Sequence, residues 1–327
     1  MKIAIDAMGG DYAPLEIIKG TLQAAGSFPQ LQLILVGRQA DIKTYLPEKL
    51  PANISLYEAG EVIEMNEHPA GAVRKKKDSS IVVGTRLVKE QQADAIVSAG
   101  STGAQMAAAL LGLGRIKGIE RPAIATVLPT LTGGKLILDV GANPDADPAH
   151  LLQYAIMGSI YAEKIMGIDR PKVALLNIGS EEGKGNELTQ KAYPLLQEAQ
   201  LNFGGNIEGR DVPYGKADVI VCDGFVGNVV LKTAEGLAGV IFELIKEKIS
   251  ATPVRKLGAL AVKPGLKEIA KMMDYAEYGG APLLGVNGIS IICHGSSKQK
   301  AIFNAIRVAE SCVNSGFTKL IAAEIAR

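Results

Sequence analysis

The chain has 327 residues, of which 47% are hydrophobic and 21% are charged, and its formal net charge is +1. This composition predicts a globular protein with a large core in one or two domains, and the balanced charge gives no overall attraction to nucleic acid. Three cysteines without paired spacing, with no signal peptide and no long apolar run, lead us to expect a cytoplasmic protein that does not span a membrane.

Strand-type and helical patterns alternate along nearly the whole chain. The patterns predict a helix over 15–25, a strand over 31–36 and another helix over 82–92. This alternation predicts an α/β fold with three layers, in which a mostly parallel mixed sheet lies between helices. No linker and no tandem repeat divides the sequence, so we expect one catalytic domain over 1–327.

Six apolar strand-type runs each end in a glycine-rich polar loop that leads into a helical pattern. These runs begin at Ile3, Ala95, Leu136, Val173, Val219 and Ile289. Parallel strands place such loops at their carboxyl edge, where helix N-termini favour anionic ligands. We therefore expect one active site, suited to an anion, at a common edge of the sheet.

The fourth of these loops, NIGSEEGKGNE, places Lys184 between two glycines. Small neighbours let a ligand approach the backbone and the ammonium group together, so Lys184 is a candidate phosphate clamp. The loop does not match a nucleoside-triphosphate loop, because three rather than four residues separate Gly179 from Gly183 and Gly185 replaces the usual Ser or Thr. The alternative is a solvated surface loop in which Lys184 points to water.

Two more helix starts carry polar side chains. Ser101 and Thr102 precede the helical pattern TGAQMAAALLGLG and offer a second place for an anion, although they are also ordinary capping residues. Asn228 falls near the next helix start, where its amide is suited either to a developing oxyanion or to an N-cap. The segment GLGRIKG follows a helix and carries an extra residue, so it does not predict a dinucleotide site.

Other catalytic classes lack the residues that they need. The chain has three histidines and no G-x-S-x-G, CxxC or HExxH motif. Asp139, Asp145 and Asp147 leave a metal formally possible, but we expect these acids to cap the helix that begins near Pro148. We expect neither a metal nor another cofactor.

The segment 232–277 departs from the alternating pattern and predicts a helical hairpin. Two long amphipathic helices are predicted, joined by an apolar and basic connector over 251–263. Between Ile245 and Tyr275, seven Lys or Arg oppose three Asp or Glu. We expect the helices to form a homodimer and the connector to touch an anionic membrane peripherally, whereas dimer pairing alone is the alternative. The proposed membrane residues are Leu257, Leu260 and Val262.

Several motifs occur together in one order: AIDAMGGDYAP, SAGSTGA, GRIKGIERPAIA, LDVGAN, GNE, DGFVGN, YGGAPLLG and HGSS. In this combination the chain resembles, from end to end, the phosphate acyltransferases of the PlsX family. The resemblance implies transfer of a fatty acyl group from acyl carrier protein to inorganic phosphate, which gives acyl phosphate for phospholipid synthesis. It also implies a homodimer with a fold similar to phosphotransacetylases and isopropylmalate dehydrogenases.

Under this resemblance, Lys184 is assigned to hold phosphate or stabilise charge, and Asn228 is the polar donor beside it. Glycines in the loops are equally suited to turns, and Asp6 is equally suited to brace the first loop. The supporting phosphate and acyl loops comprise Asp6, Gly9, Gly10, Ser101, Thr102, Gly103, Asn143, Gly185 and Asn186.

An acidic carrier protein requires a basic surface, and the chain offers two cationic clusters, either of which is also suited to a solvated face. The first comprises Arg74, Lys75, Lys76 and Lys77, and the second Arg115, Lys117 and Arg121. Three other functions stay open at this point: a phosphotransacetylase that uses coenzyme A, an NAD-dependent decarboxylating dehydrogenase, and a non-catalytic membrane scaffold.

Overall fold

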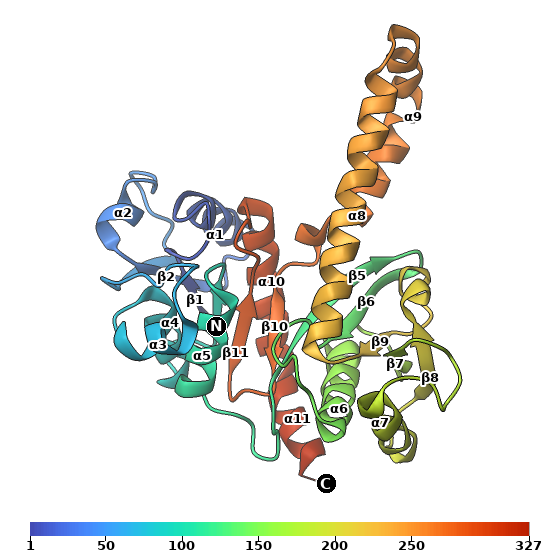
Figure 1. Cartoon of the computed structure of the whole chain (residues 1–327). Coiled ribbons are helices and arrows are strands. Elements are labelled where there is room, and N and C mark those ends of the chain that lie inside the picture. Colours follow the sequence, from blue (N-terminus) through green and yellow to red (C-terminus); the bar gives the residue numbers. More distant parts are fainter. Residues whose placement is uncertain (327) are drawn as a thin grey trace.

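An 11-stranded mixed sheet runs through the body of the molecule, and helices cover both faces (Figure 1). The computed structural model describes residues 1–326, apart from the side chains of residues 256, 257, 260 and 275. The strands are β1 (Lys2–Asp6), β2 (Gln32–Gly37), β3 (Ile54–Glu58), β4 (Ala95–Ser98), β5 (Ala123–Thr130), β6 (Gly133–Leu138), β7 (Val173–Asn177), β8 (Phe203–Glu208), β9 (Val219–Val221), β10 (Ala281–Leu284) and β11 (Ile289–Ile292). The predicted three-layer α/β fold is therefore confirmed.

The helices include a long pair, α8 and α9, that projects from the body (Figure 1). The α-helices are α1 (Leu15–Ser27), α2 (Gln39–Lys43), α3 (Pro69–Lys75), α4 (Ser80–Lys89), α5 (Thr102–Gly112), α6 (Pro148–Lys164), α7 (Glu187–Glu198), α8 (Gly224–Ser250), α9 (Pro253–Met272), α10 (Gln299–Ser315) and α11 (Phe317–Ile325). Two short 3₁₀ helices are η1 (Gly209–Tyr214) and η2 (Tyr275–Glu277).

The sheet contains two groups of parallel strands that run in opposite directions. Its order is β3-β2-β1-β4-β11-β10-β5-β6-β9-β7-β8. Strands β1 to β4 and β11 are mutually parallel, and β6, β9, β7 and β8 form a second parallel group. Three successive antiparallel pairings, β11 with β10, β10 with β5 and β5 with β6, separate the groups and reverse the direction.

This reversal corrects the prediction of one common edge for the six glycine-rich loops. The loops after β1, β4 and β11 follow the carboxyl ends of one group, whereas those after β6, β7 and β9 follow the ends of the oppositely directed group. Direction reverses because the antiparallel strands β10 and β5 lie between the groups. The sets are named the N-terminal loop set (after β1, β4 and β11) and the central loop set (after β6, β7 and β9).

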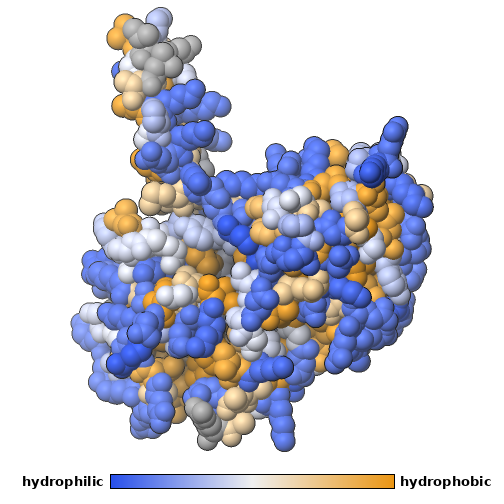
Figure 2. Space-filling view, turned by 180° about the vertical axis from the view of Figure 1, so that it is seen from behind, coloured by the Kyte–Doolittle hydropathy of each residue, from blue (hydrophilic) through white to orange (hydrophobic). Residues whose placement is uncertain are grey.

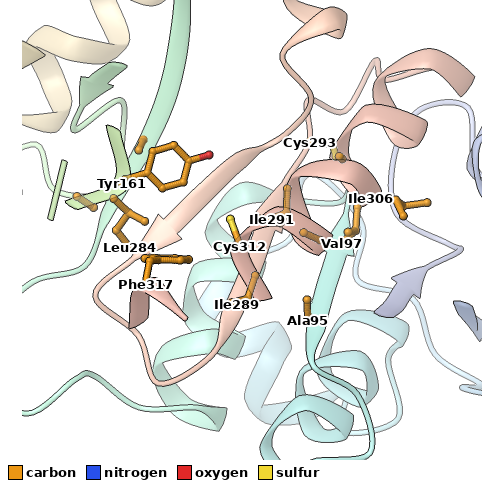
Figure 3. Close-up of a cluster of buried hydrophobic side chains, with 14 of the residues drawn as sticks. Ala95, Val97, Tyr161, Leu284, Ile289, Ile291, Cys293, Ile306, Cys312 and Phe317 are labelled. Atoms are coloured by element: carbon orange, nitrogen blue, oxygen red, sulfur yellow. The ribbon is translucent and has the colours of Figure 1, made fainter. Parts of the chain in front are cut away.

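Alternating side chains on the strands build a core on each face of the sheet. Ile3 and Ile5 pack with α1 and α10 on one face, and Ala4 packs with α4 on the other. Figure 3 shows a part of the first core, where Cys312 lies among apolar side chains and Phe317 lies near Tyr161. The rings of Tyr161 and Phe317 meet edge to face with centroids 5.9 Å apart. All three cysteines are buried and form no disulfide, which agrees with their unpaired spacing in the sequence.

The hairpin is confirmed, but the predicted connector over 251–263 is wrong. Only residues 251 and 252 separate α8 from α9, because the Thr252 hydroxyl accepts a hydrogen bond from Arg255 N at 3.3 Å and Pro253 begins the next helix. Most of the predicted connector is therefore helical. The side chains of Leu257 and Leu260 lie outside the described part of the chain, whereas Val262 is exposed on α9.

Candidate active site

Asp139, directly after β6, organises the first loop of the central set. Its carboxylate is buried and accepts hydrogen bonds from the backbone N–H groups of Ile124 (3.0 Å), Gly141 (3.2 Å), Ala142 (2.9 Å) and Asn143 (2.7 Å). Burial raises the pKa of Asp139 even though these hydrogen bonds favour the charged form. Asp139 therefore fixes its own loop. The prediction that it caps α6 is wrong.

Of the three acids Asp139, Asp145 and Asp147, only Asp147 is the N-cap of α6. Its side chain and that of His150 form a reciprocal capping box, in which Asp147 N donates to His150 Nδ1 at 2.8 Å. His150 thus belongs to the start of a helix, and its ring is buried. Asp139 therefore holds the end of this loop next to β6, and Asp147 caps the helix α6 at its other end.

Asn143 ties the loop after β6 to its neighbours. Its side-chain amide donates to Pro122 O at 2.6 Å and to the Tyr154 hydroxyl at 2.9 Å, and its backbone carbonyl oxygen accepts from Gly224 N at 2.8 Å. Desolvation and the nearby Asp139 carboxylate raise the pKa of Tyr154, which keeps its hydroxyl protonated as a partner. Asn143 is therefore a brace that joins three segments at the start of α8.

Asn228 lies in the second turn of α8 and is not an N-cap. That position belongs to Asp223, whose Oδ1 accepts from Phe225 N and Val226 N, both at 2.9 Å. The Asn228 side chain is exposed beside Gly141, where a Cβ atom would stand 3.8 Å from Asn228 Nδ2. The capping alternative is thus removed, and the amide is available at the surface of the loop after β6.

Lys184 lies on the adjacent loop of the same set. Asn177 Nδ2 donates to Lys184 O at 3.0 Å, so the backbone of Lys184 returns to the end of β7. Pairing of Leu175 with Val221 places the end of β7 beside the start of α8. The side chain of Lys184 is exposed, which suits both a phosphate clamp and a solvated loop.

The two residues after Lys184, Gly185 and Asn186, determine the shape of the loop. Gly185 has φ +107°, and a Cβ atom there would collide with Thr189 and Asn177, so only glycine fits. Asn186 caps α7, since its Oδ1 accepts from Thr189 N at 3.0 Å. Both residues shape the loop that presents Lys184.

Asp6 is the corresponding anchor of the N-terminal loop set. Its buried carboxylate accepts hydrogen bonds from Ser98 Oγ at 2.6 Å and Met8 N at 3.1 Å, and burial raises its pKa against the effect of these bonds. A Cβ atom at Gly9 would approach Gly100 N to 2.6 Å, which explains the glycine. The bracing alternative for Asp6 therefore agrees with its contacts.

The other predicted residues of this set surround the start of α5. Ser101 is the N-cap and accepts from Ala104 N at 3.4 Å, while Thr102 is exposed. Gly103 packs against Pro69, and Gly10 has φ +111° and packs against Gly295 O. The N-terminal loop set is thus a separate cluster, centred on Asp6 and α5.

A contact that the sequence analysis missed joins the two loop sets. Lys232 Nζ on α8 lies 3.3 Å from His294 Nε2, in the loop after β11. Lys232 follows Asn228 by one helical turn, and Gly295 O next to His294 accepts from Asp11 N at 2.8 Å. The spacing of Asn228 and Lys232 and the HGSS motif were visible signals, but only the fold brings them together.

The second cationic cluster lies beside the central loop set. Arg121 precedes Pro122, whose carbonyl accepts from Asn143, and Arg115 donates to Glu120 O within the same segment. Arg115, Lys117 and Arg121 are all exposed.

The first cationic cluster lies at the end of α3, in the half that carries the N-terminal loop set. Lys76 is not a free surface charge there, because its ammonium pairs with Glu67 at 2.6 Å and donates to Val62 O at 2.7 Å. This pairing corrects its assignment to an open cationic run. Arg74, Lys75 and Lys77 are exposed.

Comparisons with known proteins show the family of the chain. Residues 1–320 match the family model described as fatty acid synthesis protein. A phosphate acyltransferase of Desulfitobacterium hafniense (strain DSM 10664 / DCB-2) is 74% identical over 329 residues, covering 100% of this chain and 98% of the relative. One of Heliobacterium modesticaldum is 62% identical over 324 residues, covering 98% and 96%.

Solved structures add a likeness of fold. A phosphotransacetylase from Streptococcus pyogenes has a TM-score of 0.64 at 18% identity, covering 96% of this chain and 94% of that one. A 4-hydroxythreonine-4-phosphate dehydrogenase from Klebsiella pneumoniae has a TM-score of 0.51 at 14% identity, covering 95% and 97%. The same architecture thus occurs in a phosphotransacetylase and in a dehydrogenase, so the fold alone does not identify the reaction. The chain belongs, by its sequence, to the fatty acid synthesis protein family and is grouped there with the phosphate acyltransferases.

Proposed function

We propose that this phosphate acyltransferase takes a fatty acyl group from acyl carrier protein and gives it to inorganic phosphate, for use in phospholipid synthesis. The observation that carries the proposal is the placement of Lys184, in the loop after β7, and Asn228, in the second turn of α8, which follows the adjacent strand β9. Both side chains are exposed at the same edge of the sheet. A cation and an amide so placed suit the negative charge that develops in acyl transfer.

The reaction needs orientation and charge stabilisation. A phosphate oxygen attacks the thioester carbonyl carbon, and the resulting tetrahedral oxyanion accepts a hydrogen bond from the Asn228 amide while Lys184 neutralises charge. Collapse of this intermediate breaks the carbon–sulfur bond and releases the carrier's thiolate, which takes up a proton from the phosphate or solvent. The acyl phosphate then leaves with the new carbon–oxygen bond.

The acidic carrier protein would dock on Arg115, Lys117 and Arg121. This cluster adjoins Pro122, which is bonded to Asn143 in the loop that contacts the start of α8. The run at the end of α3 is less suitable, because Glu67 neutralises Lys76. Opposite charges at this position would guide the carrier toward the catalytic loops.

The α8–α9 hairpin would pair with a second copy of the chain. Leu237, Val240, Ile241 and Leu244 are all between 46% and 59% exposed on α8, and their spacing forms one helical stripe. By length and composition α8 is also apolar enough to cross a membrane, with a mean hydropathy of 1.4. Its first turns, however, pack on β5 and β6 in the body, which favours a dimer partner for the exposed stripe.

The far part of the hairpin would touch an anionic membrane surface. Figure 2 shows hydrophobic and hydrophilic residues together on the projecting hairpin. Exposed Val262 and Ile269 share α9 with five Lys or Arg and one Glu. Liposomes containing anionic lipid should bind the wild type, and Leu257→Asp with Leu260→Asp should release it; equal binding would remove the membrane role.

The first experiment measures acyl phosphate formed from palmitoyl-acyl carrier protein and inorganic phosphate, with EDTA and without nucleotide. Lys184→Ala should lose roughly 10²-fold or more of kcat, because a group that acts on transition-state charge is removed. Lys191→Ala is the control, since Lys191 is an exposed lysine on the neighbouring helix α7.

The donor comparison separates the remaining functions. Turnover with an acyl-coenzyme A but none with the carrier thioester would assign the enzyme to coenzyme A donors. No turnover with either donor would contradict acyl transfer and would favour a dehydrogenase or a non-catalytic scaffold.

A further inference from the structure

The methylene stem of Lys184 lies directly over Gly179, the second residue after β7. A Cβ atom built on Gly179 would stand 2.9 Å from Lys184 Cγ, 3.3 Å from Lys184 Cδ and 2.9 Å from Glu181 Oε2. Gly179 is buried and does not have a positive φ, so its backbone conformation does not itself require glycine. The missing side chain at Gly179 therefore makes the space in which the Lys184 stem lies.

The turn that leads into Lys184 is held by a side chain from β8. Lys184 N donates to Glu181 O at 3.1 Å, which closes a turn of four residues. The same oxygen accepts a hydrogen bond from Asn206 Nδ2 at 2.8 Å. Asn206 is only 6% exposed and pairs with Leu175 of β7, so its backbone is fixed within the sheet. The sheet thus sets the position of the turn through one buried amide.

The carbonyl groups around Lys184 are also held by amide side chains. Gln190 Nε2, on α7, donates to Gly183 O at 3.0 Å and to Gly185 O at 3.2 Å, and Asn177 holds the carbonyl of Lys184 between them. An exposed loop could leave three consecutive carbonyl groups to solvent and keep the entropy of these side chains. The hydrogen bonds therefore favour one geometry of the backbone that carries Lys184.

A fixed backbone and a seated stem together limit where the Lys184 ammonium can lie. A free lysine side chain samples many rotamers, and ordering it at the moment of reaction would raise the barrier. A cation that already points to the place where charge develops needs no such reorganisation. A loop that only connects β7 to α7 needs a stable turn but no particular direction for the ammonium, and this difference can be measured.

We propose that Gly179 and Asn206 are positioning residues for acyl transfer, which act through Lys184 and do not touch the substrate. The inference rests on the proposed function of Lys184 and adds the means by which its ammonium is directed. Gly179 seats the side-chain stem, and Asn206 sets the turn from which the stem leaves. Loss of either contact should move the ammonium while the sheet keeps its fold.

The first test is Gly179→Ala in the full-length enzyme, because the added methyl group meets the Lys184 stem. The kcat for acyl phosphate formation should fall about tenfold or more, while the KM for the acyl donor stays within about twofold of wild type. Gly204→Ala is the matched control, since a Cβ atom at Gly204 would meet the side chain of Lys172, an exposed lysine just before β7. This control should keep a normal kcat even where urea unfolding shows a similar loss of stability.

The Lys184→Ala background separates positioning from general damage to the fold. Gly179→Ala should lower kcat by less than about twofold in Lys184→Ala, because the residue through which it acts is already gone. An equal fold-loss in both backgrounds, or a normal kcat in Gly179→Ala while Lys184→Ala is impaired, would overturn the inference. A normal kcat in Lys184→Ala would instead contradict the proposed function of Lys184, and the positioning role would fall with it.

A readout that needs no turnover covers Asn206. NMR of isotope-labelled dimethyl-lysine resolves individual lysines, and the Lys184 signal is identified by its absence in Lys184→Arg. This signal should shift in Gly179→Ala and in Asn206→Leu, which replaces the amide donor by an apolar side chain of similar size. It should stay in place in Asn202→Leu, whose lost amide is bonded to Arg170 O. An unchanged Lys184 signal in Gly179→Ala and Asn206→Leu would overturn the inference, whatever reaction the enzyme performs.

Discussion

At its N-terminal end α8 packs glycines against the loop after β6, whereas at its far end it exposes leucine, valine and isoleucine. A Cβ atom at Gly227 would collide with Asp139 O, while one at Gly236 meets nothing within 4 Å. Only eight residues of the same helix thus lie between a crowded position and an open one. Local sequence makes the helix, but its surroundings decide what each turn does.

The two roles proposed for α8 both depend on this contrast. Close packing against the Asp139 loop holds Asn228 in place beside the adjacent Lys184 loop. The distal turns have no such support from the body, so their apolar side chains are available to a partner. The N-terminal end of α8 is thus fixed against the body, whereas its distal turns leave apolar side chains exposed for association with a partner.

The largest expected effect comes from the crowded end. Gly227→Ala should lower the free energy of unfolding by about 3 kcal/mol or more, because the added methyl group meets backbone rather than a flexible side chain. Gly236→Ala is the matched control and should raise it by roughly 0.5–1 kcal/mol through helix propensity. Urea unfolding measures both; equal effects would show that the ends of α8 are not packed differently.

Asn228→Ala tests whether the held end is catalytic. Loss of one oxyanion donor should lower kcat by roughly 10²–10³-fold, while urea unfolding stays close to wild type because the side chain is exposed. Asn202→Ala is the control for loss of an amide side chain, because Asn202 directly precedes β8 and its side chain donates to Arg170 O. A folded Asn228→Ala enzyme with near-normal kcat would remove this residue from the mechanism.

The open end should govern association. Leu237→Asp combined with Leu244→Asp should convert the expected dimer to monomer, because two charges would enter an apolar interface. Sedimentation velocity gives the mass, and Glu243→Gln in the same turns is the control. A wild-type monomer, or a double variant that remains dimeric, would contradict this use of the stripe.

The smallest effect concerns pH and separates buried from exposed acids. Because burial raises the pKa of Asp6, the native state keeps its proton to higher pH than the unfolded chain, so the Asp6 contribution falls as pH rises from about 4 toward that raised pKa. Asp6→Asn should remove this slope, about 1.4 kcal/mol per unit of pKa difference.

Urea unfolding of wild type and Asp6→Asn at about pH 4 and pH 7 measures the change. Glu268→Gln on the exposed helix α9 should leave the slope as it is. An identical pH slope in Asp6→Asn would mean that this carboxyl is not perturbed by the fold.

Much of the architecture was predictable, and the errors have physical causes. Alternating patterns gave the three layers, and glycine-rich loops identified the Lys184 and Asn228 segments. The connector was predicted as non-helical although Thr252 and Pro253 form a helix start, and α9 continues through Pro264. Lys76 looked like a free cation, because its pairing with Glu67 depends on how the loop before α3 folds.

The sequence by itself determined the helices, the strands, the turns that need glycine and the chemical types available at the loops, because these depend on neighbouring residues. Only the tertiary structure decided that the parallel groups oppose one another, since β10 and β5 pair strands that are far apart in the chain. The same long-range packing brought Lys232 to His294 and left part of α8 uncovered. Contacts between distant segments are set by the whole core, so no local pattern records them.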